Sequence, residues 1–203
     1  MSALTDSVRD LYASSFAKYG SSPMAVGWRD EESQRLRFDK LLSVTDGSKG
    51  AFELNELGVG YGALHDHLVS SGRKLAKFRG YDIVEEMIDA ARSRLPSEAE
   101  LFVGDRITQS AQFSVASGIF NVPGVPDEDR WADYIVDVLD NMNDQSTNGF
   151  AFNLLTSYVE WKAEGLYYAD PARWFSLCKS RYGRFVALLH DYPLWEWTIL
   201  VRK

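Results

Sequence analysis

The stretch that decides the fold is Phe52-Glu53-Leu54-Asn55-Glu56-Leu57-Gly58-Val59-Gly60-Tyr61-Gly62, a short strand pattern that leads directly into three glycines. We expect a strand over residues 52–57, a tight turn at the glycines and a helix that continues to about residue 70. Glycines at such a turn let a ligand approach bare backbone, and the following helix offers unpaired amides to negative or polar groups. The pattern favours a ligand site at the turn, although a plain tight connection between strand and helix would contain the same glycines.

Downstream of the glycines, short apolar strand patterns alternate with helical ones. We expect strands at residues 77–81, 101–103, 113–119 and 150–155, and helices at residues 85–94, 127–142 and 171–180. This alternation is typical of a parallel sheet covered by helices on both faces. The last two strand patterns, residues 185–189 and 196–201, are joined by a segment too short for a parallel crossover. They predict an antiparallel hairpin at the end of a doubly wound α/β sheet.

Upstream of the decisive stretch, two helical patterns cover residues 4–19 and 31–44. A turn at Gly20-Ser21-Ser22-Pro23 separates them, because glycine and proline interrupt a helix. No repeat, low-complexity run or Pro/Gly-rich linker divides the 203 residues. The chain is long enough for one sizeable core, and we therefore expect a single domain over residues 1–203.

The composition excludes several classes of protein. The chain carries 22 Lys and Arg against 29 Asp and Glu, a net charge of −7, and it has no basic cluster, so we expect no nucleic-acid partner. Its apolar runs are far shorter than the roughly 20 residues of a membrane-spanning helix, and the N-terminus has no secretory signal pattern. The single cysteine, Cys178, fits a reducing compartment, and no Cys/His cluster has metal-ligand spacing. These features predict a cytoplasmic protein without a membrane partner or a metal.

The glycines also match a dinucleotide-binding fingerprint. Gly58, Gly60 and Ala63 satisfy G-x-G-x-x-G/A, and Asp82 lies about 20 residues beyond the loop, as that fingerprint requires. Three features count against nicotinamide or flavin binding. Glu56 places a carboxylate where a dinucleotide site has an apolar position, the chain leaves no room for a separate substrate domain, and the terminal hairpin has no place in a plain dinucleotide fold.

Four further segments join the glycine stretch in one pattern, namely GYDIVEEMIDAARSRLP, LFVGD, VASGIF and the terminal EWTILVRK. From about residue 52 to residue 203, the chain resembles the class I S-adenosylmethionine-dependent methyltransferases, and the spacing across four strand ends makes the resemblance specific. The resemblance implies a seven-stranded, mostly parallel, doubly wound sheet with a C-terminal antiparallel hairpin. It further implies an N-terminal helical lid over residues 1–47 and a Rossmann-like core over residues 48–203 that binds S-adenosylmethionine.

The resemblance assigns the glycine loop to one end of the cofactor. Gly58, Gly60 and Gly62 would line its methionine and ribose portion. Glu56, at the end of the first strand, would help hold the ammonium group through water, because a carboxylate attracts a cation. This assignment gives the glycines a role beyond forming a tight turn.

The next two strand ends would hold the nucleoside. By the resemblance, Asp82 would accept hydrogen bonds from both ribose hydroxyls, Ile83 would lie against the adenine, and Asp105 would face the adenine amino group. Hydroxyls and an exocyclic amine need acceptors, so the residue types suit the task. Both aspartates also precede helices or turns, where a capping role would require the same side chain.

Substrate residues are expected at the ends of the fourth and fifth strands and from the lid, because ligands bind at the carboxyl edge of such sheets. Asn121 and Tyr158 are our candidate catalytic residues, the first to orient a substrate or the amino-acid end of the cofactor and the second to offer a hydroxyl or a ring face. Loop capping is the structural alternative for Asn121. Of the histidines, His190 comes into reach only if the hairpin turn folds over the sheet, whereas His65 and His67 are expected on the helix after the glycines.

Aromatic residues outside the strands could hold the cationic sulfur of the cofactor, since ring faces attract cations with about 0.5–2 kcal/mol. Tyr19 and Trp28 flank the turn between the two N-terminal helices and are our candidates for such cofactor contacts. Packing of the lid helices is the alternative for each ring. The available rings are Tyr12, Tyr19, Trp28, Tyr158, Tyr167 and Tyr168.

The leading functional hypothesis is an S-adenosylmethionine-dependent methyltransferase that acts on a small molecule. The Asn-Pro-Pro-Tyr type motif of nucleic-acid amino methyltransferases is absent at the fourth strand, where the chain has SGIFNVP. A second hypothesis is a cyclase or lyase that converts the cofactor itself to azetidine-2-carboxylate and methylthioadenosine. A third is a non-catalytic cofactor-binding domain.

Overall fold

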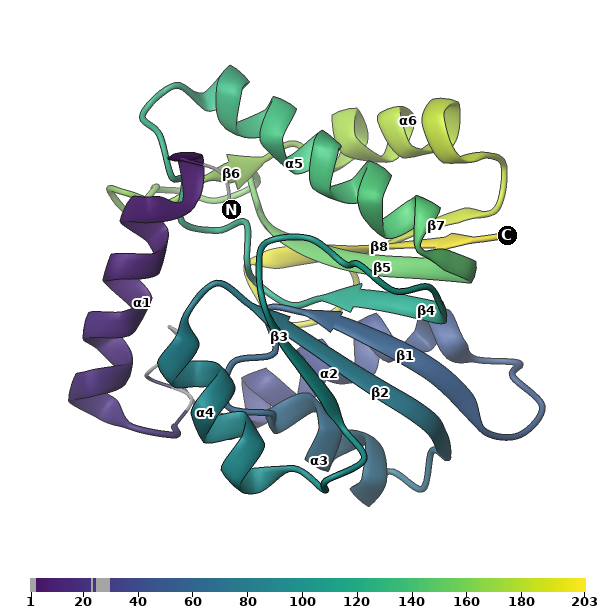
Figure 1. Ribbon diagram of the computed structural model, residues 1–203. Helices are drawn as coiled ribbons and strands as arrows, with labels where there is room; N and C mark the ends of the chain where they lie inside the picture. The colour runs from purple at the N-terminus through teal and green to yellow at the C-terminus, as the bar shows by residue number, and fades with distance from the viewer. Residues whose placement is uncertain (1–2, 23, 25–29) are drawn as a thin grey trace.

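The computed structural model describes residues 3–22, 24 and 30–203, and it has the layered α/β architecture expected from the sequence (Figure 1). The strands are β1 (Phe52–Leu57), β2 (Leu75–Asp82), β3 (Glu100–Val103), β4 (Ala111–Ala116), β5 (Ser146–Thr156), β6 (Tyr168–Ala169), β7 (Val186–Leu189) and β8 (Glu196–Arg202). The α-helices are α1 (Asp6–Tyr19), α2 (Glu31–Leu42), α3 (Ala63–Ser70), α4 (Glu85–Arg94), α5 (Glu128–Asp144) and α6 (Pro171–Tyr182). Short 3-10 turns at Ala3–Thr5 and Ser43–Thr45 extend α1 and α2.

The sheet confirms the predicted topology. Its strand order is β3-β2-β1-β4-β5-β8-β7, and the first five strands in this order run parallel. β8 lies antiparallel to β5 and forms an antiparallel hairpin with β7. The two-residue β6 pairs with the end of β5 as an additional short strand that the sequence did not predict.

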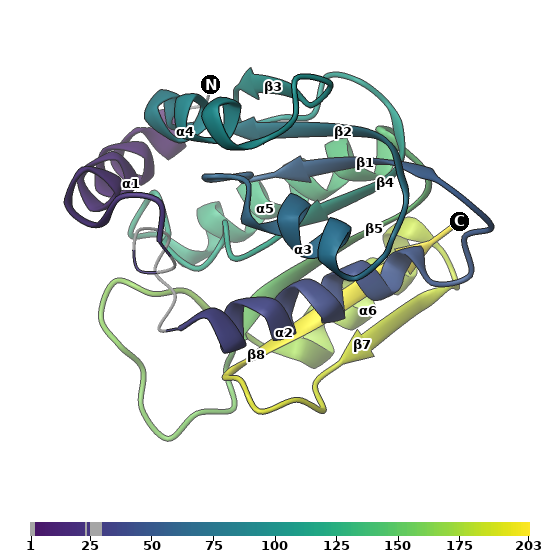
Figure 2. The same ribbon diagram turned by 90° about the horizontal axis from the view of Figure 1, so that it is seen from below.

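Two hydrophobic clusters cover the two faces of the sheet. On one face, side chains of α2, α3 and α4, such as Leu41 and Leu64, pack with Leu54 of β1 and Val115 of β4. On the other face, α5 and α6 pack against the sheet around Trp197. In Figure 2, which looks onto the sheet, α2 and α3 lie in front of the strands and α5 and α6 lie behind them. Because both faces are buried, the strands have the apolar runs of a doubly wound sheet.

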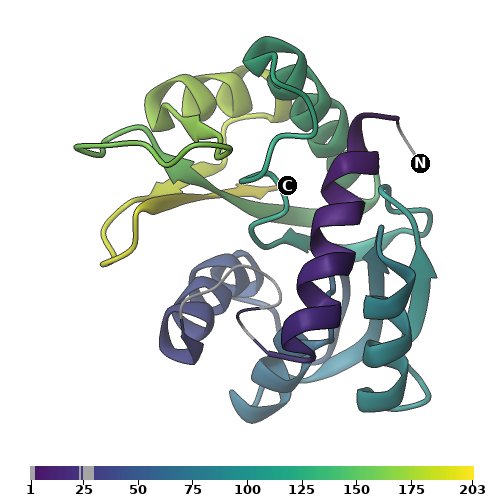
Figure 3. The same cartoon turned by 90° about the vertical axis from the view of Figure 1, so that its left-hand side faces the viewer.

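Helix α1 lies across the carboxyl edge of the parallel strands rather than on a face (Figures 1 and 3). Its N-terminal end touches the loop after β4, where a Cβ built on Gly124 would lie 1.6 Å from the backbone oxygen of Leu4. The hydroxyl of Ser7 also donates to the Gly124 carbonyl (3.2 Å). The contact requires glycine at this position, and it fixes the start of α1 over the strand ends.

The expected lid of residues 1–47 contains two elements that lie differently. α1 covers the carboxyl edge, whereas α2 packs on the sheet with Leu41 and Leu42 fully buried. The division of the chain at residue 47 stays a prediction. None of the helices in the described ranges is long and apolar enough to cross a membrane.

Candidate functional site

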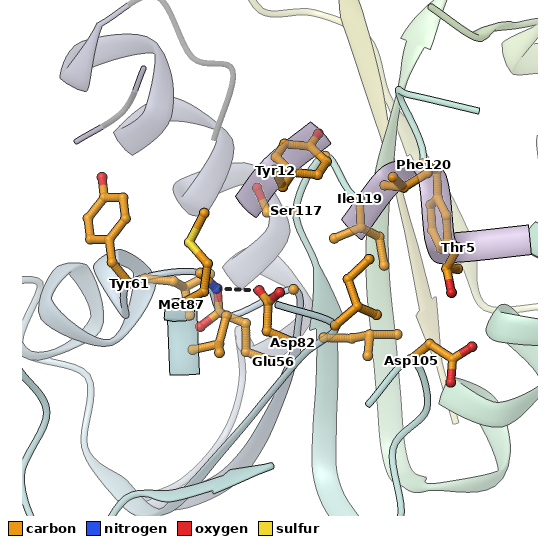
Figure 4. Close-up of a pocket in the computed structure, with 18 of the residues that line it drawn as sticks. Thr5, Tyr12, Glu56, Tyr61, Asp82, Met87, Asp105, Ser117, Ile119 and Phe120 are labelled. Carbon is orange, nitrogen blue, oxygen red and sulfur yellow. Dashed lines mark hydrogen bonds between the residues drawn. The ribbon is translucent and has the colours of Figure 1, made fainter. Parts of the chain in front are cut away.

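A pocket opens between α1 and the carboxyl ends of β1, β2 and β4, and we call it the edge pocket (Figure 4). It encloses about 930 Å³ of space, part of which is open to solvent. The glycine loop forms its floor, and Thr5, Val8 and Tyr12 from the N-terminal turn and α1 form its roof. The pocket thus lies where the sequence placed a ligand site.

The glycine loop is held by the end of the neighbouring strand. The backbone amides of Gly58 and Val59 both donate to the Tyr81 carbonyl (2.7 and 3.0 Å), and the Gly60 amide donates to Asp82 Oδ2 (2.8 Å). Gly58 has a φ of +81°, and a Cβ there would lie 2.1 Å from Ile119 Cγ2. Glycine is therefore required at Gly58 both for its backbone conformation and for its close packing.

Asp82 lies at the centre of the pocket floor in Figure 4. Its Oδ2 accepts from Gly60 and its Oδ1 accepts from the Val84 amide (3.0 Å), just before α4 begins. Burial raises its pKa, while hydrogen bonds from backbone amides lower it. The capping alternative and the ligand role are compatible, because the carboxylate ties two loops together and still lines the pocket.

Glu56 is only 2% exposed, and it lines the pocket beside the glycines. Its Oε2 has no hydrogen-bond partner among the described residues. Burial, and secondly the charge of Asp82, raise the pKa of Glu56 well above its ordinary value. A buried carboxylate without a partner is costly, so a cation such as an ammonium group would satisfy it.

Ile83, Met87 and Asp105 also line the pocket, and Figure 4 shows Met87 on the side of Tyr61 and Asp105 on the opposite side of Asp82. Ile83 and Met87 contribute apolar surface to the lining, and Asp105 contributes a carboxylate. Tyr12 reaches into the pocket from α1, and burial together with the charge of Asp82 raises its pKa to about 12. Tyr12 therefore keeps its hydroxyl proton at neutral pH, and this hydroxyl can donate a hydrogen bond to a ligand.

Two of the predicted cofactor residues, Gly62 and Tyr19, are not among the described residues that line the pocket. Gly62 caps the start of α3 with a φ of +87° and packs against Leu95, so glycine suits the backbone there, and its contact with the cofactor stays a prediction. Tyr19 ends α1 with 39% exposure, and its ring contacts Lys18. Trp28 lies outside the described residues.

The two candidate catalytic residues lie at the carboxyl edge but outside the edge pocket. Asn121 is 6% exposed, and its side-chain oxygen accepts from the Leu155 amide (3.3 Å), while its carbonyl accepts from Tyr167 (2.8 Å). Tyr158 is 62% exposed, and its ring centroid lies 5.9 Å from that of His190. The hairpin turn therefore does come beside the loop after β5, as Figure 2 shows.

The sequence reasoning did not assign several pocket residues. Gln34 and Phe38 reach the pocket from α2, and Tyr61 reaches it from the glycine loop itself. The phenol of Tyr61 donates a long hydrogen bond to Gln34 Oε1 (3.4 Å). Only Tyr12 had a sequence signal, as one of the aromatic residues outside the strands. Ser117, whose hydroxyl has no partner among the described residues, belongs to the expected substrate edge after β4.

The three acids Glu56, Asp82 and Asp105 come from consecutive strand ends around one pocket. They can hold an ammonium, two hydroxyls and an amine, which are groups that S-adenosylmethionine carries. A sheet of this strand order with a terminal antiparallel hairpin and such a row of acids defines the class I S-adenosylmethionine-dependent methyltransferases.

Comparisons with known proteins agree with this class. The protein named "Putative methyltransferase Rv1506c" from Mycobacterium tuberculosis is 47% identical over 156 residues, which are 75% of this chain and 93% of that protein. The chain therefore belongs to the class I S-adenosylmethionine-dependent methyltransferase family. The resemblance drawn from the sequence is confirmed, and it replaces the dinucleotide interpretation of the glycines. No protein-family model matches the chain.

Solved structures share the fold at low sequence identity. The N-methyltransferase NodS from Bradyrhizobium japonicum, in complex with S-adenosyl-L-homocysteine, has a TM-score of 0.68 at 15% identity and covers 96% of this chain and 99% of its own. Magnesium protoporphyrin IX methyltransferase from Synechocystis, with bound S-adenosylhomocysteine, has a TM-score of 0.67 at 12% identity. The match covers 97% of this chain and 98% of that protein. The small RNA methyltransferase HEN1 has a TM-score of 0.63 at 14% identity over 85% of this chain and 25% of its own.

Proposed function

We propose that the chain transfers the methyl group of S-adenosylmethionine, bound in the edge pocket, to a small molecule. The observation that carries this proposal is the buried carboxylate of Glu56, whose Oε2 is unpartnered among the described residues and lies in a pocket with two further acids. Burial and the charge of Asp82 oppose ionisation of Glu56, so its carboxylate form favours a ligand that brings a positive charge. The ammonium of the cofactor meets this requirement.

The other residues would bind the remaining groups of the cofactor. Asp82 would accept hydrogen bonds from the ribose hydroxyls with the lone pairs that its two backbone partners leave free. Ile83 would lie against the adenine, and Asp105 would accept from the adenine amino group. Gly58 and Gly60 would let the cofactor approach the bare backbone of the loop.

When bound, the cofactor supplies an electrophilic methyl group. The acceptor must align with the bond that breaks, so positioning provides much of the rate. In this proposal the carboxylates of Glu56, Asp82 and Asp105 are occupied by the cofactor, and the described residues that line the edge pocket include no Lys, His or Cys that could serve as a base instead. We infer that the acceptor presents a free lone pair, or that its proton is taken up outside the edge pocket.

Asn121 and Tyr158 stay our candidates for positioning the acceptor. Asn121 connects the loop after β4 to β5 and to the loop before β6 through its two hydrogen bonds. Tyr158 and His190 form an exposed ring pair where these loops end. If they contact the acceptor, Tyr158→Ala raises KM for it by about threefold or more while the affinity for cofactor is unchanged, consistent with a lost ring contact.

A small acceptor is supported by the acidic chain and by a pocket lined with carboxylates. A net charge of −7 disfavours phosphate backbones, although the fold also occurs in an RNA methyltransferase. The single buried thiol of Cys178 is consistent with a reducing compartment, and we propose a cytoplasmic location.

Calorimetry with S-adenosylhomocysteine tests the proposal. We expect micromolar binding, and NAD, tested in parallel, should not bind. Incubation with S-adenosylmethionine alone then distinguishes transfer from cyclisation, because methylthioadenosine released without an acceptor indicates the cyclase. Methyl incorporation from labelled cofactor into small-molecule fractions supports the proposal, whereas incorporation into RNA or DNA, or absence of cofactor binding, contradicts it.

A further inference from the structure

The amino-acid end of S-adenosylmethionine carries a carboxylate as well as an ammonium group. The described residues that line the edge pocket include the acids Glu56, Asp82 and Asp105 but no Lys, Arg or His. A carboxylate placed among these acids cannot rely on an ion pair with them. Among the described residues of this lining, only neutral groups can donate hydrogen bonds to it.

Gln34 is a neutral donor of this kind. It is 6% exposed, so it is buried by its neighbours, and it lines the edge pocket from α2. Its Oε1 accepts the hydrogen bond from the phenol of Tyr61 (3.4 Å). Its amide nitrogen donates to none of the residues that the structure describes, so the donor end of this buried side chain is left for a ligand.

The neighbouring cation on α2 is committed elsewhere. Arg37 lies three residues after Gln34, and its Nε donates to Glu196 Oε2 at 2.7 Å. Glu196 is fully buried at the start of β8, and burial raises its pKa while Arg37 lowers it. Because this buried pair is costly to separate, Arg37 stays with Glu196. Gln34 therefore lines the edge pocket, whereas the guanidinium of Arg37 does not.

Tyr61 is held so that it can orient the amide. The guanidinium of Arg94 lies 5.1 Å from its ring centroid, and Arg94 itself pairs with Asp66 (2.6 Å). Burial raises the pKa of Tyr61, so its hydroxyl keeps the proton that it donates to Gln34. With the amide oxygen held by this proton, the amide nitrogen is the end of Gln34 that faces away from Tyr61.

We propose that Gln34 binds the carboxylate of the cofactor through its amide nitrogen, and that Tyr61 positions it for this contact. Glu56 binds the ammonium group, so the two charged groups at the amino-acid end are recognised by two different elements, β1 and α2. The inference rests on the proposed function, because it concerns the same cofactor. It also predicts that the pocket discriminates among adenosyl compounds by the presence of a carboxylate.

Two ligands separate this contact from the rest of the site. S-adenosylhomocysteine carries both charged groups, whereas its decarboxylated form keeps the ammonium and the nucleoside. We expect Gln34→Glu to weaken the binding of S-adenosylhomocysteine by about tenfold or more, since it puts an anion against the carboxylate, and to weaken the decarboxylated form less than about twofold. Gln34→Leu and Tyr61→Phe should show the same selectivity with smaller losses, about threefold to tenfold.

Gln109→Glu is the matched control, because it makes the same charge change at an exposed residue outside the pocket. Its dissociation constants should equal those of the wild type. Equal losses for the two ligands in the Gln34 variants, or no loss for either, overturn the inference. If Gln34→Glu does not fold, Gln34→Leu and Tyr61→Phe decide the same question. Failure of the wild type to bind S-adenosylhomocysteine at all would instead contradict the proposed function.

Discussion

The charge of Asp82 raises the pKa of Glu56, and both carboxylates line one pocket at the ends of adjacent strands. Burial contributes more to this shift than Asp82 does. Two acids so arranged destabilise the empty protein, because each is desolvated and one has an oxygen without a partner among the described residues. The arrangement becomes favourable when a ligand brings positive charge and hydrogen-bond donors. The two acids therefore lower the folding stability of the ligand-free protein and strengthen its binding of such a ligand.

Replacing Glu56 with glutamine should therefore stabilise the protein at neutral pH. An acid with a raised pKa in the folded state binds more protons when folded than when unfolded, so stability falls as pH rises from the ordinary value of 4.5 toward the raised pKa. The gain of Glu56→Gln over the wild type should be present at pH 7 and should disappear as pH falls to about 4.5. Denaturant unfolding at several pH values measures it. Glu164→Gln, an exposed control, should not change stability, and a destabilised Glu56→Gln would contradict this account.

The same substitution should weaken cofactor binding and remove its pH dependence. In the wild type, ionised Glu56 attracts the ammonium group, so the affinity for S-adenosylhomocysteine should rise with pH through the raised pKa of Glu56. In Glu56→Gln the affinity should be nearly constant with pH, and it should be lower by about tenfold, corresponding to about 1.4 kcal/mol, at pH values where Glu56 of the wild type is ionised. Calorimetry over a pH series that starts near 4.5 and rises through the titration provides the test. An unchanged pH profile in the variant would assign the titration to another group.

Asp82→Asn should weaken cofactor binding strongly. The carboxylate accepts from Gly60 and Val84 and would also accept from the ribose, whereas an asparagine has one acceptor oxygen and places a donor on the other side. We expect a loss of at least about tenfold in affinity for S-adenosylhomocysteine, or about 1.4 kcal/mol. Asp89→Asn, in an exposed pair with Arg92, is the control and should leave affinity unchanged. Wild-type affinity in Asp82→Asn would show that this residue only shapes the loop.

Gly58→Ala tests why the loop contains glycine. The new methyl group would lie 2.1 Å from Ile119 Cγ2, on a backbone with a φ of +81°. We expect about 2–4 kcal/mol of destabilisation, the sum of conformational strain and overpacking. Gly165→Ala has a similar φ of +76° with nothing within 4 Å, so it measures the strain alone. Adding Ile119→Ala should recover part of the difference, and equal losses in the two glycine variants would exclude the packing contribution.

The fold could be predicted from the sequence because local patterns and topology agree. The expected strand at residues 52–57 and helix at residues 85–94 coincide with β1 and α4. The strand expected over residues 113–119 instead ends at Ala116, because the chain turns into the pocket wall at Gly118, which has a φ of +71°. A glycine inside an apolar run gives little warning of such a turn. β6 could not be predicted from the sequence either, because a strand of two residues is too short to show an alternating hydrophobic pattern.

The candidate site could be predicted only where its residues follow strands. Glu56, Asp82, Ile83 and Asp105 occur at positions fixed by the sheet, and all four line the edge pocket. Gln34 and the residues of the roof, such as Tyr12, come from helices far away in the chain. Their side chains reach the pocket through tertiary packing, which helical periodicity cannot distinguish from burial in a core.

The contact between Gly124 and Leu4 leads to the last prediction, which concerns the roof of the pocket. Gly124→Ala would place a methyl group 1.6 Å from the Leu4 carbonyl oxygen, so the start of α1 must move away. We expect faster hydrogen exchange of the amides in Asp6–Tyr19 and an affinity for S-adenosylhomocysteine that is lower by about threefold to tenfold, while the core elements keep their protection. Ser7→Ala, which removes the hydrogen bond to Gly124, should act in the same direction more weakly. Gly165→Ala should leave the exchange of α1 unchanged. If Gly124→Ala loosens α1 without affecting affinity, α1 covers the pocket without contributing to binding, and a hydrogen bond from Tyr12 to the ligand would be contradicted.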